Sequence, residues 1–226
     1  HSCLKDMIPD NSVLSHDLLE GSFLRTACLS GTELPDGFPS SVKAYYKRMG
    51  RWIRGDVQLI PWLFPRIKTK YSVINNPLSR LSKFKIADNL RRAITSILCF
   101  LLIALYAIFT TPQTAAAAIC SLAALSAPLI LNGIERINNF GNKVNTRYHS
   151  TIYAGFRGGL MLFVSRFLFL PFEAWIQLKS VSKSLWRMLV TKRKLLEWMT
   201  AAEAEKYKTK GILGEYVIML PLCVSA

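Results

Sequence analysis

The sequence predicts a mainly α-helical membrane protein, and two observations carry this prediction. Hydrophobic residues make up 51% of the 226 residues, although the formal net charge at pH 7 is +15. The charges are segregated from the apolar residues, because residues 93–134 contain no Asp, Glu, Lys or Arg. Since one helical span needs about 20 apolar residues, this block is long enough to cross a bilayer twice. Soluble basic proteins and disordered basic tails are seldom so apolar, so both classes are disfavoured.

In the middle of the charge-free block, the sequence T-T-P-Q-T at residues 110–114 predicts a tight turn between two helices. We expect these helices at about residues 93–109 and 115–131, the second of them rich in alanine, and small side chains favour close helix packing in lipid. Arg92 precedes the block and Arg136 follows it, so the positive-inside rule places both flanks in the cytoplasm. A hairpin buried in a soluble protein is the alternative, but soluble core helices rarely run so far without a charge.

Two further hydrophobic segments are interrupted by charges. Within residues 159–178, Arg166 and Glu173 are seven residues apart, so we expect them on one face of a helix that lies at the interface or packs against the hairpin. Residues 185–199 have the pattern of a basic amphipathic helix, with Lys192 on the apolar stripe, where it would have to snorkel. This helix could lie on an anionic inner leaflet or dock on its own protein, and the pattern leaves both open.

The cysteines and the chain ends add two expectations. The five cysteines are scattered and form no C-x-x-C pair, which argues against a disulfide framework or a zinc site. The sequence begins with His1, without a signal-peptide pattern, and ends in an apolar run at residues 211–226. We therefore expect an internal piece of a larger polypeptide, in which residues 211–226 begin a candidate further transmembrane helix.

Asp17 is the first candidate for chemistry. Residues 13–14 suit the end of a strand and residues 18–28 suit a helix, so we expect Asp17 at the junction between them. A carboxylate held there by backbone N–H groups could stay ionised, as a general base requires. Asp17 and Glu20, however, also have the spacing of a capping box, and an Asp in this position is more commonly a helix N-cap.

The second candidate is the string R-M-G-R-W-I-R-G-D-V-Q at residues 48–58. On a helix, Arg48, Arg51 and Trp52 stand at i, i+3 and i+4, so two guanidinium groups and an indole converge on one face. Guanidinium groups bind phosphate oxygens, and an indole stacks on a sugar ring. The composition alone favours another function, in which the arginines bind anionic lipid headgroups and Trp52 anchors the helix. Beside a membrane hairpin we expect no nucleic-acid partner.

The order of these elements resembles that of the membrane-bound processive glycosyltransferases of the cellulose synthase type. Those enzymes carry a T-E-D motif at a strand end and a Q-x-x-R-W motif on an interfacial helix. Here S-H-D stands at residues 15–17 and R-M-G-R-W at residues 48–52, so His16 replaces Glu and Arg48 replaces Gln. The longer strings L-S-H-D-L-L-E-G and R-x-x-R-W-I-R-G-D-x-Q resemble the cyclic β-1,2-glucan synthases, as does L-L-E-W-M-T-A-A-E-A-E at residues 195–205.

The resemblance implies a function and roles for particular residues. It implies an inverting transfer of glucose from UDP-glucose to a growing β-1,2-glucan. Asp17 would be the catalytic base that deprotonates the acceptor hydroxyl. Arg51, together with Arg48, would hold the diphosphate and stabilise the leaving group. Trp52 would stack on the acceptor sugar. His16 is a further substrate-binding candidate, although its departure from the motif puts in doubt any role the usual Glu has.

The resemblance also implies a cofactor and a location. The cofactor is Mg²⁺ or Mn²⁺, whose ligands lie outside this chain. The location is the bacterial inner membrane, with a multi-pass topology, the catalytic side in the cytoplasm and anionic headgroups as neighbours, and this fragment alone would be inactive. The alternatives are another processive polysaccharide synthase, or a non-catalytic scaffold or transport segment that binds anionic lipid.

The predicted fold class is a mainly α membrane protein that contains the C-terminal part of a GT-A-like glycosyltransferase domain with few short strands. We expect five regions. Residues 1–66 are this part with its interfacial helix, and residues 67–92 are a basic cytoplasmic linker. Residues 93–134 are the transmembrane hairpin, residues 135–210 are a basic amphipathic region, and residues 211–226 are the truncated final helix.

Overall fold

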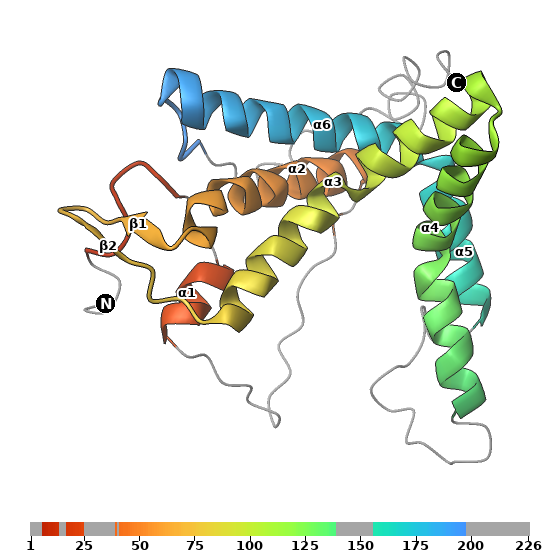
Figure 1. Ribbon diagram of the computed structural model, residues 1–226, viewed down its shortest axis with the longest axis horizontal. Helices are drawn as coiled ribbons and strands as arrows, with labels where there is room; N and C mark the ends of the chain where they lie inside the picture. Colours follow the sequence, from red (N-terminus) through yellow and green to blue (C-terminus); the bar gives the residue numbers. More distant parts are fainter. Residues whose placement is uncertain (1–5, 14–16, 25–38, 40, 139–155, 198–226) are drawn as a thin grey trace. The chain divides into compact units, whose positions relative to one another are not determined.

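The computed structural model describes residues 6–13, 17–24, 39, 41–138 and 156–197, and this part of the chain is mainly helical (Figure 1). The mainly helical class is therefore confirmed. Two compact units divide the chain, and each is described by itself: the first contains residues 1–94 and 175–226, and the second contains residues 95–174. The elements in order are α1 (Asp17–Leu24), α2 (Val42–Gln58), the short 3-10 helix η1 (Ile60–Leu63), β1 (Arg66–Lys68), β2 (Val73–Asn75), α3 (Arg80–Phe109), α4 (Pro112–Asn138), α5 (Phe156–Leu168), α6 (Leu170–Trp186) and one π-helical turn (Arg187–Thr191).

The first unit is built on a core that joins α1, η1, β1 and the beginning of α3. Trp62 of η1 is almost fully buried there, and the ring of Phe23 from α1 meets its ring edge-on at 5.6 Å between centroids. Asn76 holds the same turn, because its side-chain amide donates to the carbonyl of Trp62 at 2.6 Å. Burial of apolar side chains thus fixes α1 against the turn that follows α2. The buried members of this first core are Leu19, Leu59, Trp62, Ile67, Leu78 and Ile86.

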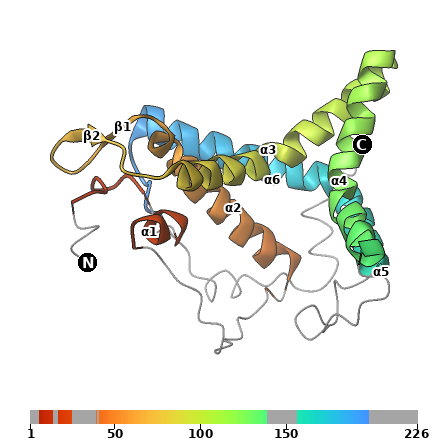
Figure 2. The same ribbon diagram turned by 60° about the horizontal axis from the view of Figure 1, so that its bottom comes forward.

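A second core in the same unit joins α2 to α3 and α6. Ile53 and Val57 lie on the apolar face of α2 and are buried together with Ala93 of α3. Side chains of α6 and the π turn, among them Val181 and Met188, pack against them. The helix begins at an N-cap, where Ser41 Oγ accepts a hydrogen bond from the backbone N–H of Ala44 at 3.2 Å. Figure 2 shows from a second direction that α2 crosses α6 at an angle, with the beginning of α2 leading away from α6.

The segment predicted as a linker contains regular structure. β1 and β2 pair antiparallel, with Arg66 opposite Asn75 and Lys68 opposite Val73. The loop between them is closed by Thr69, whose hydroxyl donates to the carbonyl of Ser72 at 2.8 Å. No other strand occurs in the part of the chain that the structure describes. In particular Val13, where we expected a strand to end, is not in a strand, and Leu14 lies outside the described residues.

The charge-free block forms two helices, α3 and α4, that are each long and apolar enough to cross a membrane. α3 begins at Arg80 rather than at about residue 93, because its first turns are amphipathic and bury Ile86 in the first core. The chain turns at Thr110, which has a positive φ of 44°. α4 then begins at Pro112, three residues earlier than expected, since proline suits the first turn of a helix.

The second unit is built around α4 and α5, which pack along each other. Its core contains Cys99 of α3, Leu125 of α4 and Leu170 of α6, all buried. The side chains of α3 and α6 also meet through a polar contact, because Ser96 Oγ donates to Glu173 Oε2 at 3.2 Å. A carboxylate in this apolar region thus has a hydrogen-bond donor, as burial of such a group requires.

The prediction that Arg166 and Glu173 share one helix face is wrong. Arg166 belongs to α5 and Glu173 to α6, and the two helices are bent by 64° at the break between them. Pro171 follows the break and lies in the first turn of α6, where its missing N–H costs no hydrogen bond. By length and composition, this bent pair of helices is a candidate for a third, broken span.

The predicted amphipathic helix at residues 185–199 is also wrong in its described part. Helical structure ends at Thr191, and Lys192 adopts a left-handed conformation with φ 50° instead of continuing an apolar stripe. Its N–H donates to the carbonyl of Arg187 at 2.8 Å, which caps the π turn. Residues 192–197, which we call the return segment, then turn back along the first unit.

Candidate functional site

Asp17 is the first residue of α1, and its side chain is exposed. α1 is anchored by Leu19, which is fully buried, so the position of Asp17 is fixed by the first core. The start of a helix carries a partial positive charge that favours an ionised carboxylate. This placement suits both a helix-capping residue and a solvent-accessible base. His16, the neighbouring candidate, lies outside the described residues.

Arg48 and Trp52 contact each other on α2, as their i, i+4 spacing leads one to expect. The guanidinium carbon of Arg48 lies 4.7 Å from the centroid of the Trp52 ring, which is a cation–π contact. The indole is nevertheless 52% exposed. α2 therefore presents a cationic and aromatic surface, which we call the 48–52 turn, while its opposite face is buried.

Arg51 completes the 48–52 turn and also lies close to a further guanidinium. Burial is the main cause that lowers the pKa of Arg54, and the positive charges of Arg187 and Arg51 lower it further. The positive charge at this end of α2 thus exceeds what the two predicted arginines supply. The sequence shows Arg54, but only the packing of the unit shows that Arg187, the residue directly after α6, lies near it.

The first unit brings α1 to the end of α2. Leu19 shares the first core with Leu59, the residue directly after α2, and Leu90 of α3 packs against both cores of the unit. The 48–52 turn lies about 9 to 15 Å along the helix axis from the end of α2, at about 1.5 Å per residue. The structure therefore places both candidate groups in one compact unit, with Asp17 on the helix that packs at the end of α2.

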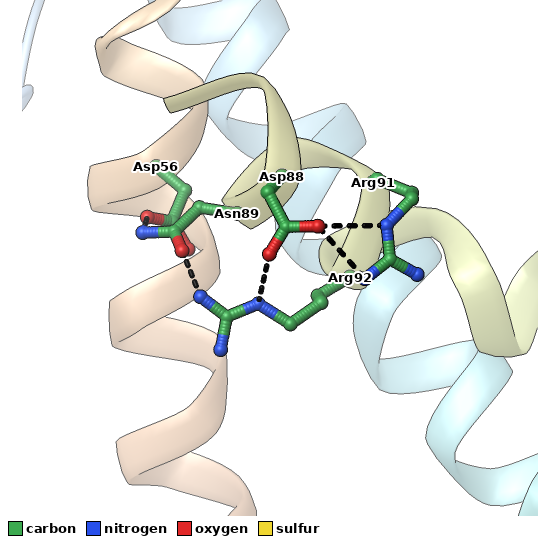
Figure 3. Close-up of polar contacts among 5 residues, drawn as sticks. All are labelled: Asp56, Asp88, Asn89, Arg91 and Arg92. Atoms are coloured by element: carbon green, nitrogen blue, oxygen red, sulfur yellow. Dashed lines mark hydrogen bonds and ion pairs between the residues drawn. The ribbon is translucent and has the colours of Figure 1, made fainter. Parts of the chain in front are cut away.

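A polar network that the sequence did not suggest ties α2 to α3 (Figure 3). Asn89 of α3 donates from Nδ2 to Oδ1 of Asp56 on α2 at 2.9 Å, and Arg92 donates to the Asn89 side-chain carbonyl. On α3 itself, Asp88 Oδ1 lies 2.8 Å from Arg91 Nη2, and its Oδ2 lies 3.5 Å from Arg92 Nε. The spacing of Asp88, Arg91 and Arg92 indicates the contacts within α3. No local pattern indicates the bond from Asn89 to another helix.

Replacing Asp56 with Ala should lower the free energy of unfolding by about 1–2 kcal/mol, because the Asn89 amide loses a charged acceptor on another helix. Asp88→Ala is the matched control. Its ion pairs lie within one exposed helix turn and should cost only about 0.3–0.5 kcal/mol. Denaturant unfolding of both variants in detergent measures the difference. If both variants lose the same free energy of unfolding, the contact between Asp56 and Asn89 contributes no more to stability than the ion pairs within α3.

In the residues that the structure describes, no three or more His, Cys, Asp or Glu side chains come together as a metal site. The described part of the chain therefore offers no set of ligands to which the implied Mg²⁺ or Mn²⁺ can be assigned.

Comparison with known proteins decides the relationship of this chain. It is 32% identical over 219 residues to the cyclic beta-(1,2)-glucan synthase NdvB of Rhizobium meliloti (strain 1021). The chain is related to a segment of a cyclic β-1,2-glucan synthase. The predicted resemblance is thereby confirmed. The match covers 95% of this chain but only 7% of NdvB, so the chain corresponds to a short segment of that long protein.

Other comparisons give no match. No family model matches the chain, and no solved structure matches it. Because the match to NdvB covers nearly the whole chain, it includes both Asp17 and the 48–52 turn. Together with the two apolar helices, α3 and α4, the relationship to NdvB indicates a membrane-associated protein.

Proposed function

We propose that this chain is a segment of a membrane-bound synthase that transfers glucose from UDP-glucose to a growing β-1,2-glucan. The relationship to NdvB over 95% of the chain carries this proposal. In it, residues 1–66 are the C-terminal part of a GT-A-like domain, and the cationic 48–52 turn, with its half-exposed indole, supplies the surface for the nucleotide sugar. The proposed setting is a bacterial inner membrane with the catalytic side in the cytoplasm and anionic headgroups around the helices.

In the proposed reaction, Asp17 takes the proton of the acceptor hydroxyl while the hydroxyl oxygen attacks the anomeric carbon of glucose. The bond from that carbon to the UDP oxygen breaks, and UDP leaves with the electron pair, so the configuration inverts. The Asp17 carboxylate is exposed at the start of α1 and is therefore accessible to such a hydroxyl.

The 48–52 turn would act on the nucleotide and the acceptor. The guanidinium groups of Arg51 and Arg48 would neutralise the charge that develops on the diphosphate. The indole of Trp52, half-exposed beside Arg48, would stack on a sugar ring. His16 stays a substrate-binding candidate, and Mg²⁺ or Mn²⁺ would be held by residues beyond this chain.

UDP with Mg²⁺ should protect the 48–52 turn of the full-length synthase in membranes. Modification of Arg48 and Arg51 by phenylglyoxal should slow about tenfold when UDP exceeds its dissociation constant tenfold, because the bound fraction follows mass action. Arg66, exposed on β1, is the control and should react at an unchanged rate. Peptide mass spectrometry reports each site separately.

The same experiment separates the alternatives. If anionic lipid protects the two arginines and UDP does not, the chain is a membrane segment that binds headgroups. That result would contradict the proposed glucose transfer. If UDP protects them, linkage analysis of the product distinguishes a β-1,2-glucan from the β-1,4 polymer of another processive synthase.

A further inference from the structure

Two rows of basic side chains lie where α2 packs against α6. Arg51 and Arg54 are three residues apart on α2, whereas Lys179, Lys183 and Arg187 are four residues apart along α6 and the π turn. Since residues three or four apart share a helix face, each row is continuous. We call these five residues the cation rim.

The two rows are close together because small residues lie between the helices. A Cβ atom on Gly50 would lie only 2.9 Å from Ser180 Oγ. One turn further along both helices, Ser184 Oγ donates to the carbonyl of Arg54 at 3.2 Å. These contacts advance in the same direction on α2 and α6, so the two helices run in the same general direction, as Figure 1 also shows. The basic side chains on either side of this contact therefore lie close together.

The crowding has an electrostatic cost. Lys183 is affected first by burial and then by the charge of Arg187, and both lower the pKa of its ammonium group. Arg54 is affected by burial and by the same guanidinium. Like charges held together favour an anion between them. Asp56, the acid of α2, accepts a hydrogen bond from Asn89 of α3.

A carboxylate of the return segment lies against these cations. Glu197 Oε2 lies 2.5 Å from Arg187 Nη2, and the same guanidinium donates from Nη1 to the carbonyl of Lys194 at 2.9 Å. Gln58 of α2 donates to the carbonyl of Leu195 at 2.9 Å and holds the segment in place. The pKa of Glu197 is lowered chiefly by its hydrogen bond from Arg187. The Glu197 side chain is half-exposed, whereas that of Arg187 is only 14% exposed, so water reaches this ion pair from the glutamate side.

We propose that Arg54, Lys183 and Arg187 form a binding site for a phosphate group, in which the Glu197 carboxylate is an internal anion that the ligand displaces. A phosphate group carries more charge and more acceptor oxygens than a carboxylate, and guanidinium groups bind it in bidentate fashion. This site goes beyond the proposed glucose transfer, because Lys183, Arg187 and Glu197 have no part in that reaction.

Two sources of the phosphate group fit the surroundings. Trp186, Leu189 and Val190 are exposed beside Arg187, and a basic helix end with exposed apolar side chains is typical of contact with lipid headgroups. A soluble diphosphate would bind the same cations. The ligand arms of the experiment distinguish the two sources.

The experiment measures binding to the chain in dodecyl maltoside, a detergent without phosphate, by isothermal titration calorimetry. One arm uses pyrophosphate and the other uses dioctanoyl-phosphatidylglycerol. Glu197→Gln should tighten binding about tenfold, because the competing carboxylate is gone, whereas Arg187→Gln and Lys183→Gln should each weaken it about tenfold or more. The ligand that binds more tightly identifies the source.

Lys85→Gln is the matched control, since it removes one exposed cation from α3, away from the cation rim. It should leave the affinity unchanged. The tighter binding of Glu197→Gln cannot result from a folding defect, so it guards the proposal against variants that merely unfold. Absence of saturable binding, or equal affinities for all four variants and the unchanged chain, would overturn the proposal and leave the cations as partners of the helix ends.

Discussion

Replacing Asp17 with Asn in the full-length synthase should lower glucose transfer by about 10²- to 10⁴-fold, the usual contribution of a general base. Asn is nearly the same size as Asp, and position 17 is exposed at the first residue of α1, so the variant should leave the helix intact. It therefore removes the proposed base without disturbing the fold. UDP release from UDP-glucose by membranes that contain equal amounts of each protein measures the effect.

Asp10→Asn makes the same chemical change at an exposed carboxylate, whose oxygen lies 3.2 Å from Lys70 Nζ. Such a surface pair contributes little, so this variant should transfer glucose at the unchanged rate. Unchanged turnover in Asp17→Asn would instead remove the base assignment and leave Asp17 as a capping residue.

Trp62→Ala should lower the free energy of unfolding by about 3–5 kcal/mol, the usual cost of removing a buried tryptophan from a core. Only 3% of this side chain is exposed, and it packs against Phe23 and the other residues of the first core. Because α1 rests on this core, the variant should also release Asp17 from its position. Denaturant unfolding in detergent, followed by circular dichroism, measures the loss.

Trp52→Ala is the matched control, since the same residue type is half-exposed on α2. Its removal ends only the contact with Arg48 and should cost less than about 1 kcal/mol of stability. In the proposed synthase it should nevertheless weaken acceptor binding. A large loss of stability from Trp52→Ala, or a small one from Trp62→Ala, would contradict the assigned packing.

The sequence predicts the two apolar helices correctly but misplaces where the first of them begins. Hydropathy marks residue 93, where charges end, whereas α3 begins at Arg80 because its first turns bury Ile86 among residues from other elements. An amphipathic beginning on an apolar helix leaves no boundary in the hydropathy pattern. Charge content therefore identifies the membrane segment, and tertiary packing decides the length of the helix.

In the candidate site, too, the sequence predicts the contacts within one helix but not those between helices. The i, i+4 spacing of Arg48 and Trp52 predicts their contact, because a helix fixes the distance between such residues. The bond between Asn89 and Asp56, and the return of Glu197 to Arg187, depend on how separate helices pack. Contacts between residues so distant in the chain leave no local pattern. The early end of α6 has the same origin, since the return segment bonds to Gln58 of α2.

Gly50 gives the 48–52 turn a sensitivity that its charged and aromatic residues do not reveal. A methyl group at this position would lie only 2.9 Å from Ser180 Oγ, so the serine side chain would have to move aside. The spacing of the guanidinium and ammonium groups on either side is therefore set by a single hydrogen atom. The size of the side chain at position 50 therefore controls how far apart these positive charges lie, and with it the electrostatic potential that a phosphate group would meet.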